Sequence, residues 1–174
     1  MTHRVVKKLT SKHVHVSWLN KMNVKLAVQV LSQSVESALC YLTVLEHLPS
    51  SASSTADFCI KIDNLFDSLN SRVLLYRTKL LLSAACSSSK HLEKCRRSLE
   101  LIKKIRFQTN GKKIQFTSIT EWQVTLSAFL LLVPELLEKI KFVLLNRFNQ
   151  DSLENFFSQV CCSLLEINLF NNKI

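Results

Sequence analysis

Glycine and proline are scarce in this sequence. Its 174 residues include one glycine and two prolines. Antiparallel sheets use these residues in their tight turns, so the scarcity argues against an all-β fold. A Walker A loop or a Gly-x-Gly-x-x-Gly motif needs several glycines, because the backbone must approach a phosphate closely. The sequence therefore excludes both of these nucleotide-binding loops.

Metal-site and disulfide motifs are also missing. None of the six cysteines forms a Cys-x-x-Cys pair, and no set of cysteines and histidines has the spacing of zinc ligands. We expect reduced thiols in an intracellular protein, most of them packed among apolar helical residues. His13 and His15 are a potential metal-binding pair, but no further ligand lies near them in the sequence.

Long apolar runs are absent as well. The runs Val73 to Cys86 and Val124 to Leu137 are interrupted by charged residues or proline, and both fall short of the ~20 residues of a membrane span. The basic N-terminus lacks the apolar core of a signal peptide. We therefore expect a soluble protein with no membrane partner.

Acidic residues are few compared with basic ones. The formal net charge is +10, which predicts an anionic partner without deciding between nucleic acid, nucleotide and acidic protein. The densest basic cluster falls in a predicted helix that lacks interleaved aromatic residues. This cluster is either a solvated helical surface or a contact for the phosphate backbone of DNA. Its members are Lys94, Arg96, Arg97, Lys103, Lys104 and Arg106.

Apolar residues recur at steps of three and four along much of the chain, which predicts an all-α fold. Residues 1–20 are predicted to be irregular, and Asn110-Gly111 predicts a turn followed by a short extended segment at 112–117. Pro134 is expected in the first turn of a helix that runs to about Leu145. The other predicted helices run from Met22 to about Leu48, from Thr55 to about Leu69, from Leu92 to Phe107 and from Thr120 to Val133.

Two acidic pairs are candidates for chemistry. Asp63 and Asp67 are four residues apart on one helical face, where like charges cost a few tenths of a kcal/mol. They form either a solvated surface compensated by Lys61 or Arg72, or a patch that awaits a cation. Asp151 and Glu154 fit a helix capping box, followed by the apolar stripe of Leu153, Phe156, Phe157 and Val160.

Three segments together resemble the P-element-type (THAP-associated) transposase family in their order and separation. They are Lys-Met-Asn-Val-Lys-Leu-Ala-Val-Gln-Val-Leu-Ser at 21–32, Asp-Asn-Leu-Phe-Asp-Ser-Leu-Asn-Ser at 63–71, and Leu-Asn-Arg-Phe-Asn-Gln-Asp-Ser-Leu-Glu-Asn-Phe-Phe-Ser at 145–158. The resemblance runs from about residue 9 to residue 160 and is loose over 72–107. It implies a GTP-binding insertion domain over 1–145, the first helix of the C-terminal RNase H-like part over 146–160, and an atypical tail over 161–174.

The resemblance also implies a set of site residues. Glu154 matches the third catalytic carboxylate, and Asp67 with Glu154 would hold Mg²⁺, which prefers hard oxygen ligands. Asn23 stands where the family tends to have a basic residue, and Lys8 matches a phosphate contact, with Lys12 as the alternative. The implied GTP-binding residues are Lys8, Asn23, Val24, Ser32, Asp67 and Asp151.

The departures from the family pattern predict a truncated product. The two catalytic aspartates and the zinc-coordinating DNA-binding domain of the family lie upstream of the matching region. We therefore expect a nuclear GTP-binding module without catalysis of its own, which docks onto a full-length transposase. The alternatives are a basic helical adaptor that binds DNA or a protein, and a non-functional transposon remnant.

Overall fold

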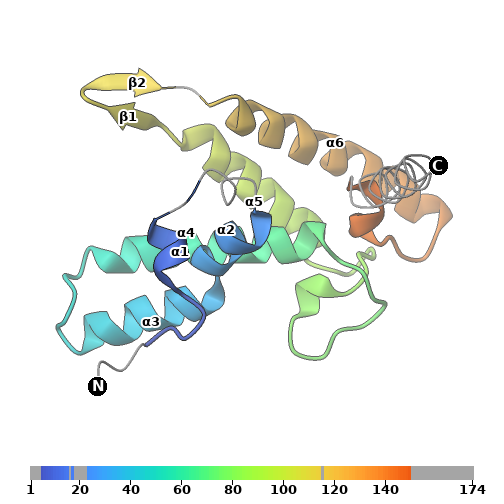
Figure 1. Cartoon of the computed structure of the whole chain (residues 1–174). Coiled ribbons are helices and arrows are strands. Elements are labelled where there is room, and N and C mark those ends of the chain that lie inside the picture. The colour runs from blue at the N-terminus through green and yellow to red at the C-terminus, as the bar shows by residue number, and fades with distance from the viewer. Residues whose placement is uncertain (1–4, 16, 18–22, 115, 150–174) are drawn as a thin grey trace, which may run out of the picture.

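The chain is predominantly helical (Figure 1), which confirms the predicted fold class; the computed structural model describes residues 5–15, 17, 23–114 and 116–149. One small two-stranded sheet accompanies the helices in this part of the chain. In chain order the elements are α1 (Ser11–Val14), α2 (Val24–Val30), α3 (Gln33–Val44), α4 (Ala52–Leu69), the 3₁₀ helix η2 (Leu80–Leu82), α5 (His91–Lys104), β1 (Phe107–Thr109), β2 (Lys112–Ile114), α6 (Thr117–Lys139) and the 3₁₀ helix η3 (Leu145–Phe148).

The main core lies where α4, α5 and α6 meet. Leu65 of α4, Leu99 of α5 and Leu126 of α6 are buried in one cluster, and Trp122 packs against it. Burying a side chain of this size stabilises the fold by about 1.5–3 kcal/mol. Helix α3 packs along α4, and α5 packs along α6. Helix α4 therefore contacts α3 and α5 and connects the two helix pairs.

A second cluster fixes the end of the described chain. Ala85 and Val143 exchange two backbone hydrogen bonds, both 2.8 Å long, beside the buried Val133. The backbone N–H of Leu145 donates to the Ser71 hydroxyl at 3.0 Å. The carbonyl of Ser71 accepts from the N–H of Asn146 at 3.2 Å. These bonds hold η3 against the C-terminal end of α4.

The predicted turn at Asn110-Gly111 is confirmed. Both residues have positive φ, 50° and 77°, as a two-residue hairpin turn with an Asn-Gly sequence requires. The strand at 112–114 pairs with β1, and α5 ends at Lys104, so Phe107, the last residue of the predicted helix, lies in β1 instead. The rings of Phe107 and Phe116 meet edge to face, with their centroids 4.7 Å apart, and join the hairpin to the start of α6.

The predicted continuous helix from Met22 to Leu48 is wrong, because the structure divides it at residues 31–32. Ser32 has an extended backbone (φ −126°, ψ 158°) at the start of α3. Its hydroxyl donates to the carbonyl of Gln29 at 2.9 Å. Such a local bond competes with the helical ladder and favours a helix start at serine. Apolar periodicity across the break could not show it.

Two further boundaries differ from the sequence prediction. Residues 1–20 contain the short helix α1, whose Thr10 N–H donates to the Nδ1 atom of His13 at 3.0 Å. Pro134 lies inside α6 instead of starting a new helix, and α6 ends at Lys139. A proline in a helix interior costs about 3 kcal/mol. Leu126 is buried in the main core and Val133 in the second cluster, and this burial offsets that cost.

Replacing Leu126 with alanine tests the importance of the core. Leu126 is fully buried, whereas Leu131 on the same helix is 72% exposed. We expect Leu126→Ala to lower the free energy of unfolding by about 2–5 kcal/mol, because it leaves a cavity. Leu131→Ala should change it by less than about 0.5 kcal/mol. Urea denaturation followed by circular dichroism measures both values, and equal losses would contradict the proposed core.

Candidate functional site

A groove of about 590 Å³ lies between α2, the end of α4 and α6. We call it the α2–α6 groove. Its wall from α2 includes Val24 and Gln29, and its floor includes Phe66, at the last turn of α4. The complete lining is Val24, Lys25, Val28, Gln29, Phe66, Leu69, Asn70, Arg72, Trp122, Thr125, Phe129, Phe148 and Asn149.

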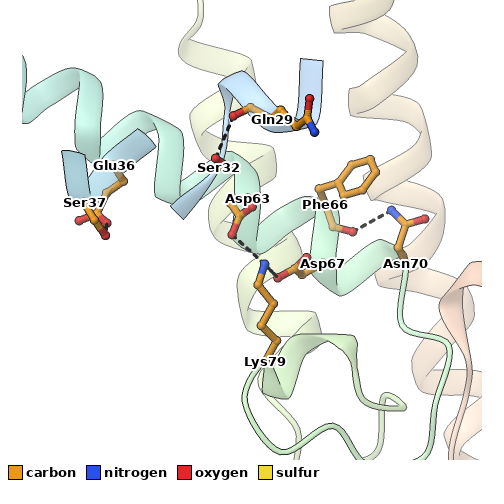
Figure 2. A network of polar contacts seen from close by, with 9 residues as sticks. All are labelled: Gln29, Ser32, Glu36, Ser37, Asp63, Phe66, Asp67, Asn70 and Lys79. Atoms are coloured by element: carbon orange, nitrogen blue, oxygen red, sulfur yellow. Dashed lines mark hydrogen bonds and ion pairs between the residues drawn. The ribbon is translucent and has the colours of Figure 1, made fainter. Parts of the chain in front are cut away.

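Aromatic, cationic and amide side chains meet in the α2–α6 groove. Figure 2 shows Gln29 on α2 facing the turn of α4 that carries Phe66 and Asn70. The Asn70 amide donates to the carbonyl of Phe66 at 2.8 Å and caps the end of α4. Gln29 Oε1 lies 2.9 Å from Nε2 of His13, which ties α1 to α2. Arg72 and Lys25 add positive charge, so the groove suits a planar anionic ligand.

A second cavity of about 620 Å³ lies on the neighbouring side of α4. We call it the Lys79 cavity. The ammonium of Lys79 lies 2.7 Å from Asp67 Oδ2 and 3.2 Å from Asp63 Oδ2, as Figure 2 shows. The two carboxylates are 13% and 8% exposed, and the Lys79 side chain is 36% exposed. One lysine from the segment between α4 and η2 thus bridges two nearly buried acids.

Burial and charge oppose each other at this bridge. The pKa of Asp67 is raised on balance: burial is the largest cause, the hydrogen bond and charge of Lys79 oppose it, and the negative charge of Asp63 adds to it. Burial alone would lower the pKa of Lys79, but its hydrogen bonds and charge interactions with Asp67 and Asp63 raise it above its ordinary value. The ammonium is therefore held in its charged form.

The opposite wall of the Lys79 cavity carries His91 at the start of α5. His91 is 2% exposed, with Nε2 3.0 Å from the Leu81 carbonyl and Nδ1 2.9 Å from the Ser89 hydroxyl. Burial lowers the pKa of His91, so the neutral ring is favoured. These contacts fix the loop before α5.

The acidic pair differs from the solvated surface that the sequence allowed. The compensating cation is Lys79, and neither Lys61 nor Arg72 takes that role; Lys61 pairs with Asp57 at 3.5 Å. Within residues 5–15, 17, 23–114 and 116–149, no group of three or more His, Cys, Asp or Glu side chains could hold a metal ion. The carboxylates of Asp63 and Asp67 instead accept hydrogen bonds from the ammonium of Lys79. The Mg²⁺ site predicted at Asp67 and Glu154 stays a prediction, because Glu154 lies outside the described residues.

The structure distributes the predicted GTP-binding residues over several places. Val24 lines the α2–α6 groove, whereas Asp67 lines the Lys79 cavity. Ser32 lies at the break between α2 and α3. Asn23 precedes α2, and the exposed Lys8 precedes α1; neither is among the residues that line the two hollows. Asp151 lies outside the described residues, as do residues 150–160 of the helix predicted over 146–160 and the tail over 161–174.

Sequence reasoning missed the bridge and much of the groove. Lys79 meets Asp63 from sixteen residues away, through a segment without helical periodicity. Phe66 is half-buried and lines the groove. Its position one residue before Asp67 was the only local signal. Trp122 and Phe148 join the groove through tertiary packing, which no local pattern reports.

No helix in the described part of the chain is long and apolar enough to span a lipid bilayer. The described cysteines are free: Cys59 and Cys95 are buried, Cys40 is exposed and Cys86 is half-buried. The expectation of core thiols is therefore met at two of the four, while Cys161 and Cys162 lie outside the described residues.

Comparisons with known proteins support the resemblance seen in the sequence. Residues 1–80 match the family model of the TNP-like, GTP-binding insertion domain. The fold is similar to a solved chain of the Drosophila P element transposase strand transfer complex, with a TM-score of 0.72 and 22% sequence identity. That similarity covers 89% of this chain and 35% of the solved chain, so this chain spans about a third of its length. A search of curated proteins gave no match.

Replacing Lys79 tests the ionic bridge. We expect Lys79→Met to lower the free energy of unfolding at pH 7 by about 1–3 kcal/mol, because two poorly hydrated carboxylates lose their partner. The raised pKa of Asp67 should rise further, so the variant's acids bind protons more readily as the pH falls. The difference from the wild type should therefore shrink between pH 7 and pH 4. Thermal melting over this range measures it.

Lys61→Met is the matched control, because Lys61 pairs with an exposed Asp57 on α4. Its effect should stay below about 1 kcal/mol at every pH. The raised pKa of Lys79 means that its contribution is complete below pH 10.5 and is lost as the pH rises through that raised pKa. A pH-independent loss in Lys79→Met would contradict the bridge.

Proposed function

We propose that this chain is the GTP-binding module of a P-element-type transposase and that the α2–α6 groove holds the nucleotide. One observation carries the proposal: aromatic, amide and cationic side chains converge in a groove of about 590 Å³ that includes Val24. Ligand pockets usually measure about 300–1,000 Å³. The wall formed by α2 and α4 falls within residues 1–80, the part that matches a GTP-binding domain family.

The groove offers each part of a nucleotide a suitable contact. The rings of Phe66 and Trp122 offer apolar faces to a purine, and stacking of this kind contributes about 1–3 kcal/mol per base. The amides of Gln29 and Asn70 can donate and accept hydrogen bonds at the edge of a base. Arg72 can bind phosphate oxygens in a bidentate manner. Such a site needs no glycine-rich loop.

The described part of the chain ends beside the α2–α6 groove, two residues before the predicted acid Asp151 in the sequence. Asn149 lines the groove, and the two following peptide units span about 7 Å at most. The hydrogen bonds of Ser71 hold η3, which directly precedes Asn149, at the end of α4. We propose that Asp151 reaches the nucleotide from there. Asp67 directly follows Phe66 in α4, and its contact with a nucleotide would require an exchange of its bond with Lys79.

The wider setting is part of the same proposal. Docking onto a full-length transposase and a nuclear location rest on the family resemblance. Strand cleavage in that family needs three carboxylates, and by resemblance Glu154 corresponds to one of them. We therefore propose that this chain binds GTP without cleaving DNA by itself.

Titration with fluorescently labelled GTP tests the site. We expect saturable binding that unlabelled GTP displaces, and that ATP displaces less well. Arg72→Gln should weaken binding about tenfold or more, because a hydrogen bond from a charged donor contributes about 1.5–3 kcal/mol. Phe66→Ala should weaken it by a similar factor through lost stacking. Fluorescence anisotropy measures each dissociation constant.

Lys112→Gln is the charge-matched control, because Lys112 lies on the exposed hairpin and lines neither the groove nor the Lys79 cavity. It should leave binding unchanged. The proposal fails if the wild type shows no saturable binding, or if Arg72→Gln and Phe66→Ala both bind as the wild type does. Melting curves for each variant separate loss of binding from loss of folding.

A further inference from the structure

A third groove, of about 290 Å³, lies between α4 and α5, and four of its eight lining residues are cations. We call it the α4–α5 groove. Lys94, Arg97 and Lys104 come from α5, and Lys61 faces them from α4. The remaining lining residues are Asn64, Ser98, Glu100 and Leu101, none of which is aromatic. Two helices thus direct four positive side chains toward one surface hollow.

The helical period separates the basic cluster of α5 into two faces. At 3.6 residues per turn, Lys94, Arg97 and Lys104 lie on one side of the helix. Arg96 and Lys103 lie on a neighbouring face, about 100° around the helix from Arg97 and Lys104 respectively. Arg106, beyond the end of α5, donates to the carbonyl oxygens of Lys103 and Ile105 at 2.6 and 2.7 Å. The groove therefore uses only half of the cluster and adds Lys61.

Two of the groove cations carry no compensating charge. Arg97 pairs with Glu93, and Lys61 pairs with Asp57. In the part of the chain that the structure describes, no carboxylate lies within 4 Å of the ammonium of Lys94 or Lys104. Lys94 is nevertheless half-buried. A half-buried cation without a counter-ion is the feature that distinguishes this groove from an ordinary solvated helix face.

We propose that the α4–α5 groove binds the phosphate backbone of DNA. Lys94 and Lys104 are ten residues apart, which corresponds to about 15 Å along a helix. One DNA strand carries a phosphate about every 3.4 Å of axial rise, so Lys94 and Lys104 are far enough apart to contact different phosphates of one strand. The contact is independent of sequence, because backbone phosphates carry no base identity.

The lining argues for a polyanionic backbone over a mononucleotide. A free nucleotide needs a surface for its base, and aromatic rings are present in the α2–α6 groove but absent from the lining of this one. The groove, at about 290 Å³, is also about half the volume of the α2–α6 groove. The two proposed sites share no lining residue, so either one can fail without the other.

Paired double variants of the complete chain test the proposal. Lys94→Gln with Lys104→Gln removes two groove cations, and Arg96→Gln with Lys103→Gln removes two cations of α5 that do not line the groove. Both variants have the same net charge and retain the core contacts. Affinity for a labelled 20-base-pair duplex is measured at several salt concentrations, with a polyglutamate peptide as competitor. Melting temperatures confirm that both variants fold.

We expect the groove variant to bind DNA about tenfold more weakly at 150 mM salt and to lose about two units from the slope of log affinity against log salt. The variant that carries Arg96→Gln and Lys103→Gln should keep the wild-type slope. Lys61→Gln should weaken binding through the wall formed by α4, whereas Lys112→Gln should not. Equal losses in the two double variants, no DNA binding at low salt, or binding of polyglutamate in preference to DNA would each overturn the proposal.

Discussion

Helix α4 is the element on which the other features depend, because each of its faces has a different task. Leu65 is buried in the core with α5 and α6. Phe66 and Asn70 form the floor of the α2–α6 groove. Asp63 and Asp67 turn toward Lys79. A helix with so many occupied faces tolerates little rotation, since a turn of one residue would move an acid into the core. Burial of Leu65 therefore fixes the positions of both the α2–α6 groove residues and the acidic pair of α4.

The sequence predicted those elements whose pattern and punctuation agree. Helices α4 and α5 have clear apolar stripes, and the hairpin has an Asn-Gly turn that forms with positive φ at both residues. The sequence-based prediction failed where one hydrogen bond or the tertiary packing around one residue decides where a helix ends. Ser32 ends α2 by bonding to Gln29 without interrupting the apolar period. Pro134 stays within α6 because tertiary packing outweighs the local cost of the proline.

The candidate site was less predictable than the fold, because its contacts cross long stretches of chain. Local spacing placed Asp63 and Asp67 on one face, and the structure confirms that proximity. Nothing in the spacing identified Lys79 as their partner. The groove joins parts of α2, α4 and α6, and only Val24 among its lining residues had been selected by resemblance. Family resemblance therefore selected Val24, which no local pattern singled out, and tertiary packing determines which residues line the groove beside it.

The distribution of ring systems distinguishes the two proposed anion sites. A nucleotide combines a planar base with phosphates, so its site needs apolar faces as well as positive charge. The α2–α6 groove has both, with Phe66 and Trp122 near Arg72. A DNA backbone presents regularly spaced charges without accessible base faces. The lining of the α4–α5 groove correspondingly contains four cations and no aromatic side chain. The net charge of +10 favours either anion, whereas the placement of aromatic side chains discriminates between them.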